Sequence, residues 1–409
     1  MTHDKKRISR RTIIGMAAAI MAAVAIGLYA ASNYMLNFSI LYPKDKRGTA
    51  ETWRERMKNE CPWTAQWQDS IYSHHCVKDT FVTMPSGYKA HAIYIYAPKP
   101  TPNTAVVVHG YTVRAEGMLH IAYLYNHDMG WNVLLPDLYA HGRSEGDNIR
   151  MGWKDRWDVI RWAEIANAIF CKGQPFKSTN EVIHGISMGA ATTMAVAGEH
   201  TPDYVRWFVE DCGYTGVWQQ FETQLKEQFG LPAFPLMYTT SLLCRQRYGW
   251  SFDEAQQIKQ VERSTKPMLF IHGDADTYVP YSMLRPLYEA KRHGRKAIFI
   301  AKGSAHAMAY RDHHKEYTEK VKAFVGECST CRHVGCLDNV ADNHAILKVG
   351  KVYLHVINEF RQKGGSSRRC PIISQTRLVE RVQNSVFSSL YKSTGPKCQY
   401  LVLSVDNFL

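Results

Sequence analysis

A serine flanked by two glycines is the feature of this chain with the clearest chemical meaning. Residues 185–189 read GISMG, after an apolar run and before a run of small residues. The pattern predicts a strand, a sharp turn and a helix, with the hydroxyl of Ser187 lifted above a sheet edge as a nucleophile. We expect Gly185 and Gly189 to be required, because side chains there would collide with neighbouring backbone. The amide of Met188 would then point at the reaction centre and stabilise an oxyanion.

A serine needs a base and an acid that orients the base before it can attack a carbonyl carbon. In the segment IHGDADTYVP, both Asp274 and Asp276 follow an apolar strand closely enough to be the acid. In the segment GSAHAM, His306 stands between the last predicted strand and the last predicted helix, which favours it as the base. His313 is the second candidate for that role.

These segments, with the VHGY sequence that ends at Tyr111, resemble the α/β-hydrolase superfamily over residues 78–326. They are most similar to its membrane-anchored bacterial serine hydrolases, an esterase, lipase and serine-aminopeptidase-like branch with a small helical cap. The family order is oxyanion loop, nucleophile, acid and histidine, which is the order found in this chain. The resemblance implies a triad of Ser187, Asp276 and His306, because the family pattern H-G-x-x-D-x-x-V-P places the acid at Asp276.

The resemblance also implies an oxyanion hole built from the backbone amides of Tyr111 and Met188. His109 and Gly110 would shape the loop that carries the first of these amides. The alternative is that His109 and Gly110 only end a strand. The histidine segment departs from the family in having Ser304 where a smaller residue is usual.

A fourth segment, PDLYAHGRSEG, also resembles the family and contains Asp137 and His141. Both side chains are chemically suited to catalysis. We assign them a structural role instead, as part of a buried polar turn that satisfies backbone groups beneath the oxyanion loop.

The rest of the body predicts an α/β fold. Short apolar runs alternate with amphipathic segments, which is typical of a mostly parallel sheet, here eight-stranded, with helices on both faces. The expected strands span residues 80–84, 89–97, 105–108, 132–135, 181–183, 207–209, 268–271 and 297–300, and the clearest helices span 116–126, 152–170 and 312–325. The interval 213–265 has helical pieces but no convincing strand, so it is predicted to form a cap over the strand ends.

The N-terminus carries a second strong signal. Residues 12–32 are uncharged and mostly apolar, which is long enough for a transmembrane helix, and residues 1–11 are basic, which predicts that the N-terminus stays in the cytoplasm and the body lies outside. A cleaved secretory signal and a twin-arginine signal are the alternatives. Residues 33–77 are expected to form a linker with a helical segment, and residues 327–409 a C-terminal extension of unknown role.

Composition restricts the classes of function. The chain has 409 residues, of which 45% are hydrophobic and 21% charged, so it is globular rather than disordered. Its net charge of +13 is concentrated at the two ends, and no basic stripe interleaved with aromatic residues crosses the middle. This argues against nucleic acid as a partner.

The ten cysteines fit an exported protein without defining its disulfides. We expect one or more disulfides among Cys61, Cys76, Cys171, Cys212 and Cys244. The alternative is that several are small buried apolar side chains. The cluster Cys328, Cys331, His333 and Cys336 lacks a second pair at zinc-ribbon spacing unless Cys370 or Cys398 contributes, so thiols or disulfides are expected there rather than a metal.

The sequence therefore predicts an exported, membrane-anchored serine hydrolase that cleaves an ester, thioester or amide through an acyl-enzyme on Ser187. Its expected partners are a small-molecule or lipid-like acyl substrate and the membrane, and the mechanism requires no cofactor or metal. A peptidase or acyltransferase of the same fold is an alternative, because all share the triad. A non-catalytic binding module of this fold is the alternative from another class.

Overall fold

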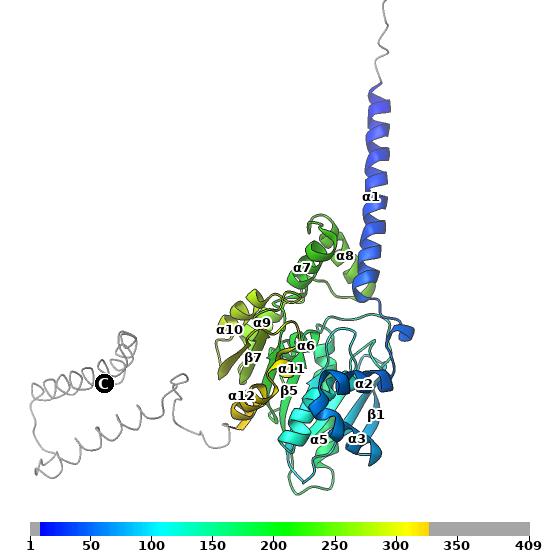
Figure 1. Cartoon of the computed structure of the whole chain (residues 1–409). Coiled ribbons are helices and arrows are strands. Elements are labelled where there is room, and N and C mark those ends of the chain that lie inside the picture. Colours follow the sequence, from blue (N-terminus) through cyan, green and yellow to red (C-terminus); the bar gives the residue numbers. More distant parts are fainter. Residues whose placement is uncertain (1–8, 327–409) are drawn as a thin grey trace, which may run out of the picture. The chain divides into compact units, whose positions relative to one another are not determined.

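The computed structural model describes residues 9–326, and residues 1–8 and 327–409 lie outside the described part of the chain. The predicted C-terminal extension and the cluster at Cys328 to Cys336 are therefore not described. An eight-stranded sheet with the order β1-β2-β4-β3-β5-β6-β7-β8 forms the centre of the body (Figure 1). The strands are β1 (Val77–Thr83), β2 (Lys89–Ile95), β3 (Asn103–Val108), β4 (Asn132–Asp137), β5 (Asn180–Ile186), β6 (Val205–Asp211), β7 (Met268–Gly273) and β8 (Lys296–Ala301).

The sheet is mostly parallel, as predicted. The hairpin β1–β2 is antiparallel and β2 runs antiparallel to β4, whereas the pairs from β4 to β8 are parallel. Alternate side chains of β3 enter two separate cores, with Val106 in one and Val107 in the other. A strand that is buried on both faces reads as a continuous apolar run, which explains why these strands were recognisable in the sequence.

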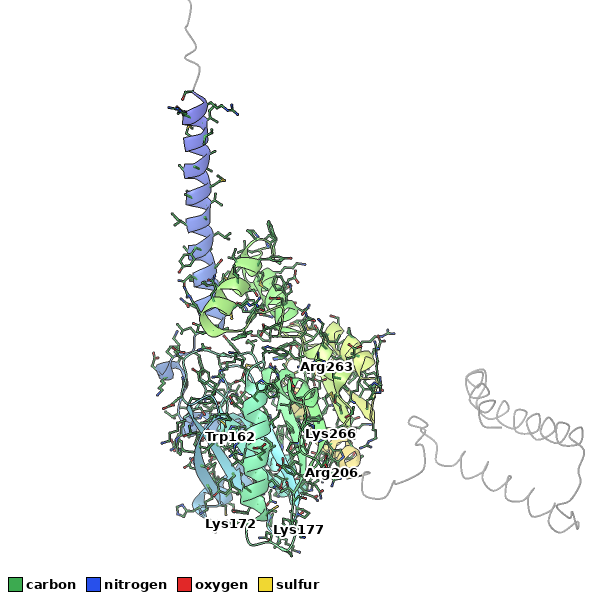
Figure 2. The ribbon with its side chains drawn as sticks, turned by 180° about the vertical axis from the view of Figure 1, so that it is seen from behind. Trp162, Lys172, Lys177, Arg206, Arg263 and Lys266 are labelled. Carbon is green, nitrogen blue, oxygen red and sulfur yellow. The ribbon has the colours of Figure 1, made fainter. Side chains whose placement is uncertain are left out.

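Helices cover both faces of the sheet. The first core contains side chains of α5 (Asp155–Cys171), α6 (Met188–Ala197), α9 (Gln257–Arg263) and α10 (Leu284–Ala290). Trp162 of α5, fully buried, is marked on this side in Figure 2. The second core contains side chains of α3 (Ala65–Ser73), α4 (Leu119–Tyr123), α11 (Ala309–Asp312) and α12 (His314–Gly326).

The remaining elements are short or lie before the sheet. Helix α2 (Ala50–Glu60) precedes α3, and its N-terminus is closed by reciprocal hydrogen bonds between Thr49 and Thr52. Single turns occur at η1 (Lys44–Lys46), η2 (Pro62–Thr64), η3 (Ala115–Met118) and η5 (Tyr281–Met283), and η4 (Leu124–Asp128) is a π-helical turn.

Helix α1 (Arg10–Ile40) is longer than the predicted apolar span. The hydroxyl of Ser9 accepts a hydrogen bond from the amide of Thr12 and caps its start. Nearly every side chain from residue 10 to 31 is exposed, and Ser32, Leu36 and Ile40 then form a buried stripe. Within residues 9–326, α1 is the one helix long and apolar enough to cross a bilayer. The length and composition of this N-terminal helix are typical of a membrane anchor or a signal sequence.

Two helices rise above the strand ends between β6 and β7. These are α7 (Val217–Phe229) and α8 (Leu236–Tyr248), and α8 contacts the second half of α1 (Figure 1). The following α9, although inside the interval predicted as a cap, packs against α6 as part of the layer on the sheet. The name cap is kept below for residues 217–248, that is α7, α8 and their connection.

The five cysteines within the described residues are free thiols. The expectation of a disulfide among them is wrong in this structure. Cys61, Cys212 and Cys244 are buried, which agrees with the alternative that they are small apolar side chains.

Candidate active site

Ser187 occupies a strained turn between β5 and α6. Its backbone has φ +57° and ψ −117°, a conformation that non-glycine residues rarely adopt. Its amide donates to the carbonyl of Asp211, at a distance of 2.8 Å. A Cβ atom at Gly185 would lie 2.0 Å from the carbonyl oxygen of Gly189, and a Cβ at Gly189 would lie 2.1 Å from that of Val108. Neither position has room for a side chain unless the backbone shifts.

The strand ends bring Ser187, His306 and Asp276 together. Strands β5, β7 and β8 are parallel, so the segments that follow them emerge at the same edge of the sheet. His306 Nε2 lies 2.8 Å from Ser187 Oγ, and His306 Nδ1 lies 2.7 Å from Asp276 Oδ2. With Asp276 ionised, Nδ1 carries the proton and Nε2 is left to accept from the serine hydroxyl.

The alternative candidates make other contacts. Asp274 accepts a hydrogen bond from the amide of Gly303 at 2.6 Å and so closes the turn that leads to the histidine loop. His313 Nε2 lies 2.9 Å from the carbonyl of Lys302. Neither side chain hydrogen-bonds to Ser187 or His306.

Asp276 is buried and held in place by four groups. Its Oδ1 accepts from the amides of Tyr278 and Val279, both at 3.0 Å. Its Oδ2 faces His306 and also lies 3.3 Å from His272 Nε2. Burial alone would raise the pKa of Asp276, but the hydrogen bonds from His272 and His306 outweigh it and hold the pKa below the usual value for an aspartate. Asp276 is therefore a carboxylate at neutral pH.

His272 is a member of this site that the sequence reasoning did not select. Its ring is fully buried at the end of β7, and its Nε2 also lies 3.0 Å from the carbonyl of Val279. Burial lowers the pKa of His272, but the contact with Asp276 and the charge of Glu210 outweigh burial and raise it. The one available signal was its place in the quoted acid segment, two residues before Asp274.

The loop after β3 lies against the nucleophile turn. A Cβ at Gly110 would meet the carbonyl of Ile186 at 3.4 Å and the Cβ of Ser187 at 3.5 Å. Within residues 9–326, neither the amide of Tyr111 nor that of Met188 donates to a protein acceptor, so both remain available near Ser187. His109 is fully buried and accepts from the amide of Leu138 at 2.9 Å, which braces the loop from below.

The segment with Asp137 and His141 supports the same loop. His141 Nε2 accepts from the amide of Thr112 at 3.2 Å, and Asp137 Oδ1 accepts from the amide of Ala115 at 2.8 Å. Neither side chain contacts Ser187 through a hydrogen bond. These contacts confirm the structural role that we predicted for this segment.

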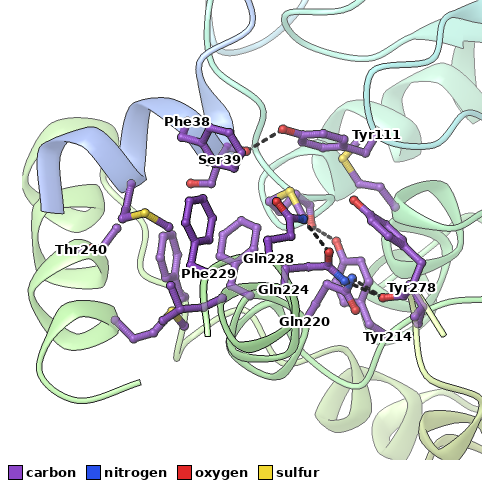
Figure 3. A pocket seen from close by; sticks show the side chains of 18 of the residues that line it. Phe38, Ser39, Tyr111, Tyr214, Gln220, Gln224, Gln228, Phe229, Thr240 and Tyr278 are labelled. Carbon is purple, nitrogen blue, oxygen red and sulfur yellow. Dashed lines mark hydrogen bonds between the residues drawn. The ribbon is translucent and has the colours of Figure 1, made fainter. Parts of the chain in front are cut away.

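Two cavities meet at Ser187. The first, about 190 Å³, lies between the cap and α1, and most of its lining is apolar (Figure 3). Its lining includes Met35, Phe38, Tyr111, Leu225, Phe229 and Met237. The second, about 370 Å³, shares Ser187, Tyr111 and Tyr278 with the first and is also bordered by α2, by the loop and turn after β3, and by the histidine loop. It contains charged side chains, those of Arg56, Glu60 and Arg311.

The chain is similar to several known proteins. Residues 146–331 match the prolyl oligopeptidase family. The chain is 30% identical over 322 residues to YqkD, an uncharacterised protein of Bacillus subtilis strain 168, covering 77% of this chain and 97% of that protein. Among solved structures, it resembles the Pyrococcus furiosus esterase Pf2001 (TM-score 0.49, 21% identity, 61% of this chain and 90% of that one). It also resembles Est1E of Butyrivibrio proteoclasticus with bound ferulic acid (TM-score 0.46, 20% identity, 61% and 98%).

The chain therefore belongs to the α/β-hydrolase superfamily, and its residues 146–331 match the prolyl oligopeptidase family. It is a hydrolase with a helical cap and an N-terminal apolar helix.

Proposed function

We propose that this protein cleaves a carboxylic ester through an acyl-enzyme on Ser187, with His306 as the base and Asp276 as the acid that orients it. The observation that carries the proposal is the continuous hydrogen-bonded path from Ser187 Oγ through His306 to Asp276, with distances of 2.8 and 2.7 Å. Each contact lies within the range expected for a nucleophile and its base.

The steps follow from this path. His306 Nε2 takes the proton of Ser187 as Oγ attacks the carbonyl carbon, and the negative charge that develops on the substrate oxygen is stabilised by the amides of Tyr111 and Met188. His306 then gives the proton to the departing alcohol oxygen, and the acyl group stays on Ser187. Water attacks the acyl-enzyme in the same way, which releases the acid and restores the serine.

A peptide or amide is the second candidate substrate, because residues 146–331 match a peptidase family. The same triad acts on both bonds, so the pocket decides between them. The mostly apolar cavity beneath the cap favours an acyl group without charge.

We also propose that α1 is retained as a membrane anchor, with the basic N-terminus in the cytoplasm and the body outside. The small residues Ala30, Ala31 and Ser32 mark where a signal peptidase could cut, and contacts between α1 and α8 occur on both sides of Ala30 and Ala31. The hydroxyl of Ser32 lies 2.6 Å from that of Thr239, and Arg247 donates to Asn33 Oδ1 at 2.7 Å and to the hydroxyl of Tyr29 at 3.2 Å. Of these contacts, the one made by Tyr29 would be lost with a cleaved signal, so this contact favours retention.

A fluorophosphonate probe tests the enzyme directly, because it labels an activated serine. We expect the full chain to be labelled, the Ser187→Ala variant to remain unlabelled, and a control change at the exposed Ser70, Ser70→Ala, to be without effect. A matched pair of an ester and an amide with the same acyl group then separates the two candidates. Equal labelling of the wild type and Ser187→Ala would contradict the proposed nucleophile.

A further inference from the structure

Helix α1 forms one wall of the apolar cavity beside Ser187. Its residues Met35, Phe38 and Ser39 line that cavity together with side chains of the cap (Figure 3). The ring of Phe38 contacts the ring of Phe229 edge to face, with centroids 5.4 Å apart. A helix whose first two thirds are exposed and apolar therefore ends inside the site.

The part of α1 that lies above the cavity is long enough to cross a bilayer. Residues 12–31 rise about 30 Å at the spacing of an α-helix, which matches the hydrocarbon core of a membrane. The contacts of Ser32 and Asn33 with α8 follow at once, so the cap is attached to the helix directly beneath this span. The cap and the cavity mouth would then lie at the membrane surface.

The border of the mouth is apolar where it faces the span. Phe38 and Phe229 are 51% and 37% exposed although they line the cavity, so its outer end lies between α1 and α7. In the connection of the cap helices just beyond, Leu231 and Phe234 are 43% and 73% exposed. We call these four residues the apolar rim. Large contiguous exposed apolar surface on a globular domain marks a site that another apolar surface covers.

The second cavity is more polar than the first, because three charged side chains line it, although most of its lining is also apolar. Arg56 lies 2.8 Å from Glu60, and Arg311 lies 3.8 Å from the same carboxylate and 4.0 Å from Asp312. Of these two acidic groups, Glu60 lines the cavity together with both guanidinium groups. Polar and charged groups of a substrate are better accommodated there than in the first cavity. Because the two cavities meet at Ser187, a bond cleaved at this serine would separate a part held in the more apolar cavity from a part that lies beside charged side chains.

We propose that the substrate is an amphiphilic ester of the bilayer, which enters from the membrane across the apolar rim. Its acyl chain lies against the last turns of α1, and its polar alcohol part occupies the cavity of Arg56 and Arg311. The inference rests on the esterase function proposed above. The ester bond to the alcohol breaks, the acyl chain is held on Ser187 in the first cavity, and the alcohol leaves with the proton from His306.

The test uses the full chain in phosphatidylcholine vesicles and two esters of one fluorogenic alcohol. The acetate stays in water, and the decanoate partitions into the vesicles. The double variant Leu231→Glu/Phe234→Glu places two charges on the rim without changing a residue that lines the cavity. The control variant Ile298→Glu places a charge on the edge strand β8, where the side chain is 40% exposed.

We expect the double variant to cleave the vesicle-bound decanoate at least about tenfold more slowly than the wild type, because charge at this depth opposes contact with lipid. Its turnover of the acetate and its fluorophosphonate labelling should stay within about twofold of the wild type, since Ser187 and its partners are unchanged. Ile298→Glu should leave both rates unaltered. Equal decanoate rates for the double variant and Ile298→Glu would overturn the membrane route while leaving the esterase proposal intact. If the wild type cleaves neither ester and is not labelled, the esterase proposal itself is wrong.

Discussion

The hydroxyl of Tyr111 donates a hydrogen bond to the backbone carbonyl of Ser39, at a distance of 2.9 Å. Tyr111 belongs to the loop whose amide is placed beside Ser187, and Ser39 belongs to the last turn of α1. The N-terminal helix is thus joined to the site by a side chain of the candidate oxyanion loop. Changes in the position of α1 are expected to reach the site through this contact.

Tyr111 contacts α1 through its hydroxyl and offers its backbone amide to the site. Removal of the hydroxyl should separate these two roles. In Tyr111→Phe the backbone amide stays in place, so we expect acetate turnover to fall by no more than about threefold, because the donor to the oxyanion is the main chain. The free energy of unfolding should fall by about 1 kcal/mol, the usual contribution of one such hydrogen bond. Urea unfolding and steady-state kinetics measure the two effects. Tyr96→Phe, which alters an exposed tyrosine, is the control.

The acid of the triad can be tested against its neighbour in the same segment. Asp276→Asn keeps the size of the side chain but no longer fixes the proton on His306 Nδ1, and a loss of about 10⁴ in kcat is expected. Asp274→Asn should retain activity within about threefold, because within residues 9–326 the side chain of Asp274 hydrogen-bonds to the amide of Gly303 and not to the triad. A larger loss for Asp274→Asn than for Asp276→Asn would contradict the assignment. Circular dichroism of both variants checks that they fold.

The nucleophile turn should tolerate no side chain at Gly185. The Cβ of Gly185→Ala would lie 2.0 Å from a backbone oxygen, so the turn must shift, and we expect a loss of several kcal/mol of stability or failure to fold. Gly27 of α1 has no atom within 4 Å of such a Cβ, and Gly27→Ala is the matched control. Expression level and thermal unfolding compare the two. Similar stability of both variants would argue against the strained turn.

The free energy of unfolding should decrease as the pH rises, in part because of Glu210. Burial raises the pKa of Glu210 to about 8, and the charge of His272 and the hydrogen bond from the amide of Gly213 only partly oppose this. A carboxyl whose folded pKa is raised stabilises the fold fully below its unfolded pKa, and this contribution is lost as the pH rises through about 8. Burial likewise raises the pKa of Asp155 to about 7 and that of Asp211 to about 6, so Glu210 accounts for part of the effect.

The variant Glu210→Gln isolates that part. We expect it to lose less stability than the wild type between pH 5 and pH 9, by at least about 1 kcal/mol. Urea midpoints at the two pH values give the difference. An equal loss in both proteins would mean that Glu210 does not carry a proton in the fold at neutral pH.

Because α1 forms one wall of the apolar cavity, we expect a limit on the length of the acyl chain that the cavity holds. Met35 lines the apolar cavity, and Met35→Trp would fill part of its volume. We expect the preferred acyl chain to become shorter, with the decanoate rate reduced by about tenfold or more relative to the acetate rate, because overfilling a packed pocket costs about 1–3 kcal/mol. A series of straight-chain esters measures the profile. An unchanged profile would place the acyl chain elsewhere.

The sequence was sufficient for the parts of the site that follow strand ends. The segments with Ser187, Asp276 and His306 each come after an apolar run, and parallel strands end at one edge of a sheet, so their proximity could be expected. The contact between Ser32 and Thr239 joins residues 207 positions apart on two helices, and no local pattern encodes it. The role of His272 was missed for a related reason, because its distance from Asp276 depends on how the turn after β7 folds back.

The expectation of a disulfide was wrong for a similar reason, because it also concerns contacts that depend on the tertiary structure. Cysteine count and an exported location suggested pairing, but pairing depends on which residues the tertiary structure brings within bonding distance. Cys212 lies directly after β6, near Asp276 and His306, and Cys244 lies in α8. Both are buried as thiols, and burial raises the pKa of Cys244 to about 12.

The most direct test of the central claim is the mass of the acyl-enzyme. The full chain is mixed with an excess of the fluorogenic decanoate, quenched in acid within the first turnover and digested for mass spectrometry. We expect one decanoyl group on the peptide that contains Ser187, and none on that peptide in Ser187→Ala. A decanoyl group on another residue, or turnover of the ester by Ser187→Ala at the wild-type rate, would contradict it.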